Sequence, residues 1–317
     1  MTQSILDGAP WPEVVAAGIR TTADGPFAED VFWQLAVGDR VIEIPGALVD
    51  EAALGTLGAR LPGLDWNQVA RAMGSTDERV FSLWDLDSPR RATDHGALRA
   101  RFAALVARLG GDAAASDAFA RLHAAWGAPQ RRYHDLRHLA ACLFELDCAV
   151  TDSALADVIE LALWYHDAVY EPGARDCEVR SADLLARDAA TLAIPPEISG
   201  RAADLVRATA HVHAPTACGD PATDLIIDID LSILGRDPIA FMDYEHSVEE
   251  EYAAIPMAAY RTARGQFLAS LLAAPFIFRT PVFRARCEER ARAQIRSLLD
   301  GPRYSRYLRR RWWHLCG

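Results

Sequence analysis

The sequence predicts a mostly helical protein, in which an all-α helical bundle follows a small N-terminal segment of mixed α/β structure. From about residue 97 onward, apolar residues recur at three- and four-residue spacing, and no alternating strand pattern interrupts them. Residues 1–86 instead contain many turn formers, such as Gly25-Pro26 and Pro45-Gly46, and no long helical period. The apolar fraction of 51% and the charged fraction of 24% are typical of a folded globular chain.

The N-terminal segment, residues 1–86, shows three short elements. The residues at 40–44 alternate polar with apolar between two turn signals, which predicts a strand. Short helices are expected at about 48–60 and 65–73, and the fold of the segment as a whole is left open. The polar run that follows predicts a linker over 87–96, and therefore a second domain over 97–317.

Helical patterns follow one another through this second domain. They cover about 97–109, 115–126, 134–150, 153–169, 178–191, 197–212, 224–235, 238–252, 256–273 and 281–299. Several have matching boundary signals: Asp237-Pro238 supplies an N-cap and a first-turn proline, and Gly235 stands where a C-cap is expected.

Composition limits the classes of function. The net charge of −11 argues against non-specific binding to nucleic acid or to anionic membranes. The six cysteines are scattered without a C-x-x-C pair, as expected for reduced thiols. No signal peptide is recognisable, and the most apolar window, 267–278, is too short to span a bilayer. We therefore expect a soluble cytoplasmic protein; its oligomeric state is left open.

Histidines and carboxylates gather at three places in the helical region. His134 and His138 are four apart and would share a helix face. The pair His166-Asp167 ends a very apolar helix, and Asp228-Ile229-Asp230 places two carboxylates inside another. Buried charge needs compensation, which a metal ion supplies. Two imidazoles and two carboxylates suit one divalent ion, with Mn, Fe, Co, Zn and Mg all left open.

The ordered strings YHDLRH, WYHDAVYE, RATAHVH and DIDLSILG resemble the HD superfamily, and in particular its bacterial group of predicted metal-dependent phosphohydrolases. The resemblance covers about residues 97–299. It implies an HD-domain helical bundle with His138, His166, Asp167 and Asp230 as metal ligands. His138 is preferred to His134 because an apolar run follows it, and Asp230 is preferred to Asp228 because it precedes a Leu-x-x-Leu turn.

The resemblance also implies a reaction, the hydrolysis of a phosphate ester of a small molecule, such as a nucleotide, by metal-activated water. Asp167 would accept a proton from that water, and His211, or else His213, would donate one to the leaving oxygen. Arg137, Arg207 and Arg264 are the candidates for binding the phosphate. Arg264-Gly265 departs from the Gly-Arg order that is more common in the group.

Other polar residues in the helical region have simpler interpretations. Isolated histidines such as His123 are expected to be packing or hydrogen-bonding residues. The run Glu249-Glu250-Glu251 is expected to form a solvated helix face, and Glu178 to stabilise the dipole of the helix that it opens.

Three alternatives keep the same scaffold. The first is an HD-type di-iron oxygenase, although only His211 and His213 could supply the extra histidines between the HD pair and the last aspartate. The second is a nucleotide-binding regulatory HD module, against which all four ligands are present. The third is a (p)ppGpp hydrolase domain, whose other motifs are not evident in the sequence.

Overall fold

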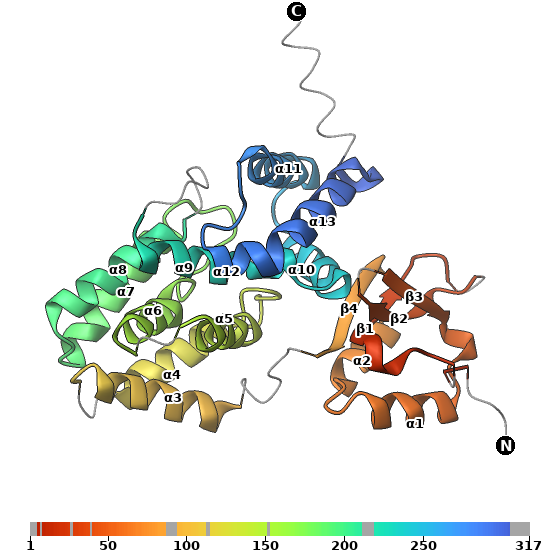
Figure 1. Cartoon of the computed structure of the whole chain (residues 1–317), viewed down its shortest axis with the longest axis horizontal. Helices are drawn as coiled ribbons and strands as arrows, with labels where there is room; N and C mark the ends of the chain where they lie inside the picture. Colours follow the sequence, from red (N-terminus) through yellow and green to blue (C-terminus); the bar gives the residue numbers. More distant parts are fainter. Residues whose placement is uncertain are drawn as a thin grey trace, which may run out of the picture. The chain divides into compact units, whose positions relative to one another are not determined.

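The computed structural model describes residues 5–6, 8–25, 28–38, 40–86, 94–111, 115–150, 153–210 and 219–304. The chain forms two compact units (Figure 1). The first unit comprises Met1–Arg90 and Arg236–Ser247, and the second comprises Arg91–Gly235 and Val248–Gly317. The segment 236–247 therefore groups with the N-terminal unit, although it lies far along the chain.

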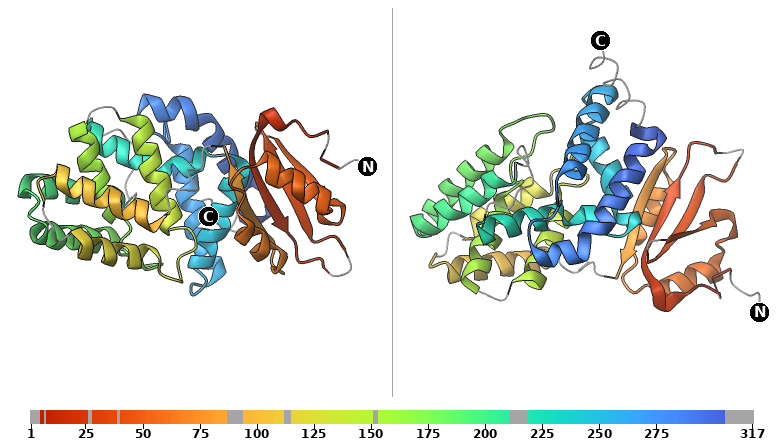
Figure 2. Two further views of the ribbon diagram at one scale, coloured as in Figure 1. Left: turned by 90° about the horizontal axis from the view of Figure 1, so that it is seen from below. Right: turned by 45° about the horizontal axis from the view of Figure 1, so that its top comes forward.

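The first unit is built on a four-stranded antiparallel sheet with the strand order β3-β2-β1-β4 (Figures 1 and 2). Its strands are β1 (Val14–Thr21), β2 (Val31–Val37), β3 (Arg40–Pro45) and β4 (Arg79–Asp85). Val37 pairs with Arg40, so that two residues connect β2 to β3. Gly38 adopts a φ of 58° there, a left-handed conformation that favours glycine.

Two helices, α1 (Glu51–Arg60) and α2 (Trp66–Met73), share a hydrophobic core with one face of this sheet. Both begin at a capping aspartate: Asp50 accepts a hydrogen bond from the Ala53 amide, and Asp65 accepts from two amides of α2. The core contains large apolar side chains of the strands, among them Trp33, Leu35 and Phe81.

The segment 236–247, which includes the first part of helix α10 (Pro238–Glu251), packs on the other side of the sheet. Ile239 forms a second apolar cluster with Ala16, Ala36 and Val80. A Cβ atom on Gly18 would lie 2.5 Å from Ile239 Cγ2, so only glycine permits this approach of helix and strand. The sheet is therefore covered on both faces within its own unit.

The burial of both faces of the sheet explains why only one of its four strands was predicted from the sequence. The strand expected at 40–44 is confirmed as β3, which is exposed enough to alternate, and both expected helices are present. The strands β1, β2 and β4 were not predicted from the sequence. Nearly every residue of β1 is buried, so its apolar run lacks the alternation that identifies a half-buried strand.

The second unit is helical, as the sequence predicted for the chain after residue 97. Its helices are α3 (His95–Arg108), α4 (Ala115–Trp126), α5 (Leu136–Ala149), α6 (Ser153–Tyr165), α7 (Cys177–Thr191), α8 (Pro196–Ala208), α9 (Pro221–Asp230), the end of α10, α11 (Met257–Ala273), α12 (Pro281–Phe283) and α13 (Glu289–Asp300). A 3-10 turn, Leu231–Gly235, follows α9, and a π-helical turn, Arg284–Glu288, joins α12 to α13.

Helix α6 lies at the centre of this unit and contacts α3, α5, α7, α8 and α9. Its last turns are apolar on all sides, and Ala162, Leu163 and Trp164 are fully buried. Glu160 is the charged exception, and its carboxylate binds Arg101 and Arg108 at 2.7 and 3.1 Å. A helix buried in this way fixes whatever stands at its C-terminal end.

The helix boundaries differ from the sequence-based expectation at three informative places. Helix α5 begins at Leu136 rather than at 134, because Asp135 caps it by accepting from the amides of Arg137 and His138. Helix α6 ends at Tyr165, before His166-Asp167, and α9 ends at Asp230.

Residues 87–93 of the expected linker lie outside the described residues, and α3 already begins at His95. Among the described helices, none has the length and apolarity needed to cross a bilayer.

One cap in the first unit makes a stability prediction. Asp237 accepts hydrogen bonds from the amides of Ile239 and Ala240 at 3.0 Å, and burial raises the pKa of its carboxyl to about 6. The native state therefore binds the proton more tightly than the unfolded chain, and stability falls as pH rises between the two pKa values. The variant Asp237→Asn keeps the cap but does not titrate. We therefore expect its free energy of unfolding, relative to that of wild type, to rise by up to about 3 kcal/mol from pH ~4 to pH ~7.

Urea unfolding of both proteins at the two pH values measures this difference. Asp50→Asn is the matched control, because Asp50 caps α1 in the same way but is exposed. An equal pH-dependent gain in the two variants would show that burial of Asp237 is not the cause.

Candidate metal centre

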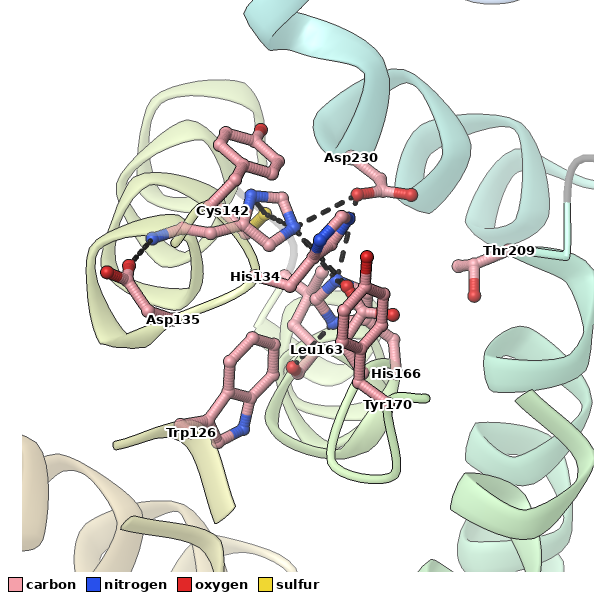
Figure 3. A network of polar contacts seen from close by, with 12 residues as sticks. Trp126, His134, Asp135, Cys142, Leu163, His166, Tyr170, Thr209 and Asp230 are labelled. Atoms are coloured by element: carbon pink, nitrogen blue, oxygen red, sulfur yellow. Dashed lines mark hydrogen bonds and ion pairs between the residues drawn. The ribbon is translucent and has the colours of Figure 1, made fainter. Parts of the chain in front are cut away.

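The predicted ligands come together inside the helical unit (Figure 3). The Nε2 atoms of His138 and His166 lie 3.1 Å apart. Asp230 Oδ1 lies 3.2 Å from the first and 3.6 Å from the second, and Asp167 Oδ2 lies 3.7 and 3.3 Å from them. Four side chains separated by up to 92 positions in the sequence, from 138 to 230, therefore direct polar atoms at one place.

Each side chain owes its position to a helix end. His138 stands in the first turn of α5, where the Asp135 cap sets the start of the helix. His166 and Asp167 follow the last residue of the buried helix α6, and Asp230 is the last residue of α9. Helix termini are suitable places for polar side chains at a core, because they emerge from it without interrupting a helix.

The imidazole of His166 is held in one orientation. Its Nδ1 lies 2.9 Å from the Leu163 carbonyl oxygen, so Nδ1 carries the proton and Nε2 faces the carboxylates. The ring of Trp126, itself fully buried, packs against it with centroids 5.3 Å apart (Figure 3). A histidine whose second nitrogen donates to a carbonyl is the usual arrangement of a metal ligand.

The electrostatics of the cluster favour a bound cation. Burial alone would lower the pKa of His166, but the charges of Asp167 and Asp230 outweigh it and raise this pKa to about 9. The side chains of both histidines are 3% exposed or less, and those of the two carboxylates are 15% exposed. Negative charge at the edge of a buried site is the condition that a metal ion or a proton relieves.

Cys142 is a further member of this group. The side chains of His138, Cys142, His166 and Asp230 have potential ligand atoms within 4.8 Å of one another, and together they are able to hold a metal ion. The sulfur lies 3.7 Å from Nε2 and 3.8 Å from Nδ1 of His138. Since it is almost equally far from both ring nitrogens, it does not lie on the lone-pair line of either. Burial raises the pKa of this thiol.

The neighbouring carboxylate, Asp228, has a different role. It is fully buried and accepts hydrogen bonds from the amides of Arg279 and Thr280, at 2.7 and 2.6 Å, and from the Thr280 hydroxyl. Asp228 thereby ties α9 to the start of α12. Of the two aspartates, only Asp230 reaches the histidines in the contacts described above.

His134 does not share a helix with His138, contrary to the sequence-based expectation, because α5 starts after it. Its ring nevertheless lies beside the cluster, with centroids 5.8 Å from His138 and 4.2 Å from Tyr170 (Figure 3). Its Nδ1 lies 2.6 Å from Oε2 of Glu251. Burial lowers the pKa of His134, but the hydrogen bond to Glu251 and the negative charges of Asp167, Glu251 and Asp230 together outweigh it, so that the pKa is raised.

Glu251 was expected on a solvated helix face, and this expectation is wrong: its side chain is 1% exposed. Its Oε1 accepts from the amides of Arg132, Tyr133 and His134, and its Oε2 also accepts from the Tyr170 hydroxyl at 2.8 Å. Although burial opposes it, hydrogen bonding lowers the pKa of Glu251 to about 2. The last residue of α10 thus holds the chain segment before α5.

The three arginines expected to bind phosphate have other described partners. Arg137 binds the Asp135 carboxylate and the Arg132 carbonyl oxygen. Arg207 forms ion pairs with Asp183 and Asp204 on the exposed side of α8, and Arg264 lies over the ring of Phe267. The expected proton donor His211, and its alternative His213, lie outside the described residues.

Three side chains of this region were not expected from the sequence. Cys142 had a usable signal, because it follows His138 by four residues on the same helix face. Glu251 had no such signal, because it stands in a run of three glutamates that the sequence does not distinguish. Only the tertiary structure shows that this one, at the end of α10, is buried. Arg131, which donates to the carbonyl oxygens of His134, Asp167 and Ala168, also had no local signal, because its partners are main-chain oxygens of other segments.

Comparison with protein-family models, with curated proteins and with solved structures gave no match.

The two aspartates at the end of α9 give a paired prediction. We expect Asp230→Ala to weaken Mn²⁺ binding by about 100-fold or more, because a ligand is lost, while most of the stability is retained. Asp228→Ala should instead lower the free energy of unfolding by about 3 kcal/mol, because three donors lose their acceptor, and should leave metal binding in the folded fraction. Calorimetric titration with Mn²⁺ and urea unfolding measure the two effects. The opposite pattern would exchange the roles of the two residues.

Proposed function

We propose that the helical unit is a metal-dependent phosphohydrolase of the HD type, which cleaves a phosphate ester of a small molecule such as a nucleotide. The observation that carries the proposal is the convergence of two imidazole Nε2 atoms and two carboxylate oxygens. The two Nε2 atoms lie 3.1 Å apart, and each of them lies within 3.7 Å of both carboxylate oxygens. It is supported by the order of the motifs along the chain, which resembles that of the HD superfamily.

The proposed ligands are His138, His166, Asp167 and Asp230. Metal–nitrogen and metal–oxygen bonds of about 2.0–2.2 Å place neighbouring ligand atoms about 2.9–3.5 Å apart, which is close to the separations above. Asp167 is preferred to Cys142 because its Oδ2 lies 3.7 and 3.3 Å from the two Nε2 atoms, whereas the sulfur lies off the lone-pair lines of His138. The resulting set of nitrogen and oxygen ligands is compatible with Mn, Fe, Co, Zn or Mg.

The bound divalent ion would supply Lewis-acid activation of water and of the phosphoryl oxygen. The chain's own residues would do the rest. His166, fixed through Nδ1, and His138 would hold the ion, and the buried Trp126 would keep water from the inner side of the site. Asp167, whose side chain is partly exposed, would bind through one oxygen and accept a hydrogen bond from the attacking water through the other.

Metal analysis and a phosphatase screen of the purified protein and of His166→Ala test the proposal. We expect about one divalent ion per chain in wild type, and a loss of both metal and activity of about 100-fold or more in the variant, because the ligand with the most fixed orientation is removed. His123→Ala is the matched control: His123 packs against His95 and Phe119 on α3 and α4 and should be dispensable for metal and activity.

Other results would favour other functions of the same scaffold. Phosphatase activity that survived His166→Ala would contradict the assignment of this site as the active site. Two irons per chain would favour the di-iron oxygenase. Tight binding of a nucleotide by the metal-loaded protein, without hydrolysis of any ester in a broad panel, would favour a regulatory module.

A further inference from the structure

His134 lies at the edge of the candidate metal centre, and several contacts hold its side chain in place. Its ring stacks on Tyr170 at an interplanar angle of 28° and meets Tyr133 and His138 edge-on. Its main-chain amide and its Nδ1 both bind the carboxylate of Glu251. With the ring clamped on its faces and at one nitrogen, the position of the other nitrogen, Nε2, is fixed as well.

Glu251 determines the chemistry of that second nitrogen. An ionised carboxylate only accepts hydrogen bonds, so the proton between the two groups stays on the Nδ1 side. An imidazole with a buried carboxylate at Nδ1 is the arrangement that stabilises a positively charged ring during proton transfer at Nε2. The side chain of His134 is 20% exposed, against 1% for Glu251, so the pair presents the imidazole and buries the carboxylate.

The place of His134 relative to the ligands fits a substrate contact. Its ring centroid is 5.8 Å from that of His138, and its Nδ1 is engaged by Glu251 rather than directed at the ligands. Figure 3 shows the ring beside the ligands. A phosphate ester bound at the ion would extend a few ångströms beyond it, which is the distance at which a proton donor to the leaving oxygen is needed.

We propose that His134 is the general acid of the reaction and that Glu251 is the residue that positions it. The role rests on the proposed phosphohydrolase function. As the oxygen of the attacking water bonds to phosphorus, the bond from phosphorus to the leaving oxygen breaks. That oxygen takes the proton from Nε2 of His134, whose N–H electron pair remains on the nitrogen. The proton released by the attacking water returns the ring to its starting state through solvent. His134 thus takes the role that the sequence suggested for His211.

Esters with different leaving groups test this role, because a good leaving group needs no proton and a poor one does. The probes are p-nitrophenyl phosphate and phenyl phosphate, with the metal-loaded full chain. We expect His134→Asn to lower kcat for phenyl phosphate by about 100-fold or more, and for p-nitrophenyl phosphate by about tenfold or less. His134→Gln is a second variant and should behave like His134→Asn. His211→Asn is the comparison variant, because His211 is the alternative proton donor; we expect any loss of activity in it to be similar for the two esters.

Glu251→Gln tests the positioning role. The amide oxygen of glutamine still accepts from the main chain, but the negative charge opposite Nδ1 is gone. As in His134→Asn, we expect kcat to fall more for phenyl phosphate than for p-nitrophenyl phosphate. The losses in kcat should be about tenfold smaller than in His134→Asn, and KM should change little. Metal content and the urea midpoint are measured for each variant, because a purely structural role would lower these together and equally for both esters.

The results distinguish this role from the function on which it rests. Hydrolysis by wild type with equal losses for both esters in His134→Asn and His134→Gln would overturn the general acid and keep the hydrolase. A leaving-group dependence that appeared in His211→Asn alone would return the role to His211. If metal-loaded wild type hydrolysed neither ester, the proposed function and this role would both fall.

Discussion

The helical unit is organised around the need to neutralise two carboxylates that lie against two buried imidazoles. Asp167 and Asp230 approach His138 and His166 to between 3.2 and 3.7 Å, in a place that solvent barely reaches. Such a cluster is costly unless a proton or a cation compensates it. The four side chains lie at or next to helix ends: His138 in the first turn of α5, His166 and Asp167 after α6, and Asp230 as the last residue of α9.

The rigidity of the surroundings follows from that arrangement. The buried last turns of helix α6 fix His166 through their packing and through the Leu163 carbonyl oxygen. Asp228, two residues before Asp230, anchors the end of α9 to the main chain at Thr280. A site held by buried anchors of this kind keeps its geometry before any ligand arrives, which is what binding and catalysis both require.

Glu251 links this site to a distant part of the chain. It is more than 110 positions from the segment 132–134 that it binds, and one carboxylate satisfies three main-chain amides there. The same carboxylate holds His134 and Tyr170. The end of α10 is therefore part of the site's framework, although the rest of this helix begins in the N-terminal unit, where Ile239 covers the second face of the sheet.

The sequence by itself determined the helical character of the chain after residue 97, the strand β3, the helices α1 and α2, and the histidines and aspartates that meet at the candidate metal centre. These features depend on local periodicity, on capping residues and on ordered motifs, all of which are written in neighbouring positions. Only the tertiary structure decided that β1, β2 and β4 are strands, that Asp228 is an anchor, and that Glu251 is buried against His134. Each of these depends on contacts between segments far apart in the chain: burial on both faces removes the alternation of a strand, and the partner of a buried carboxylate leaves no trace in the residues next to it.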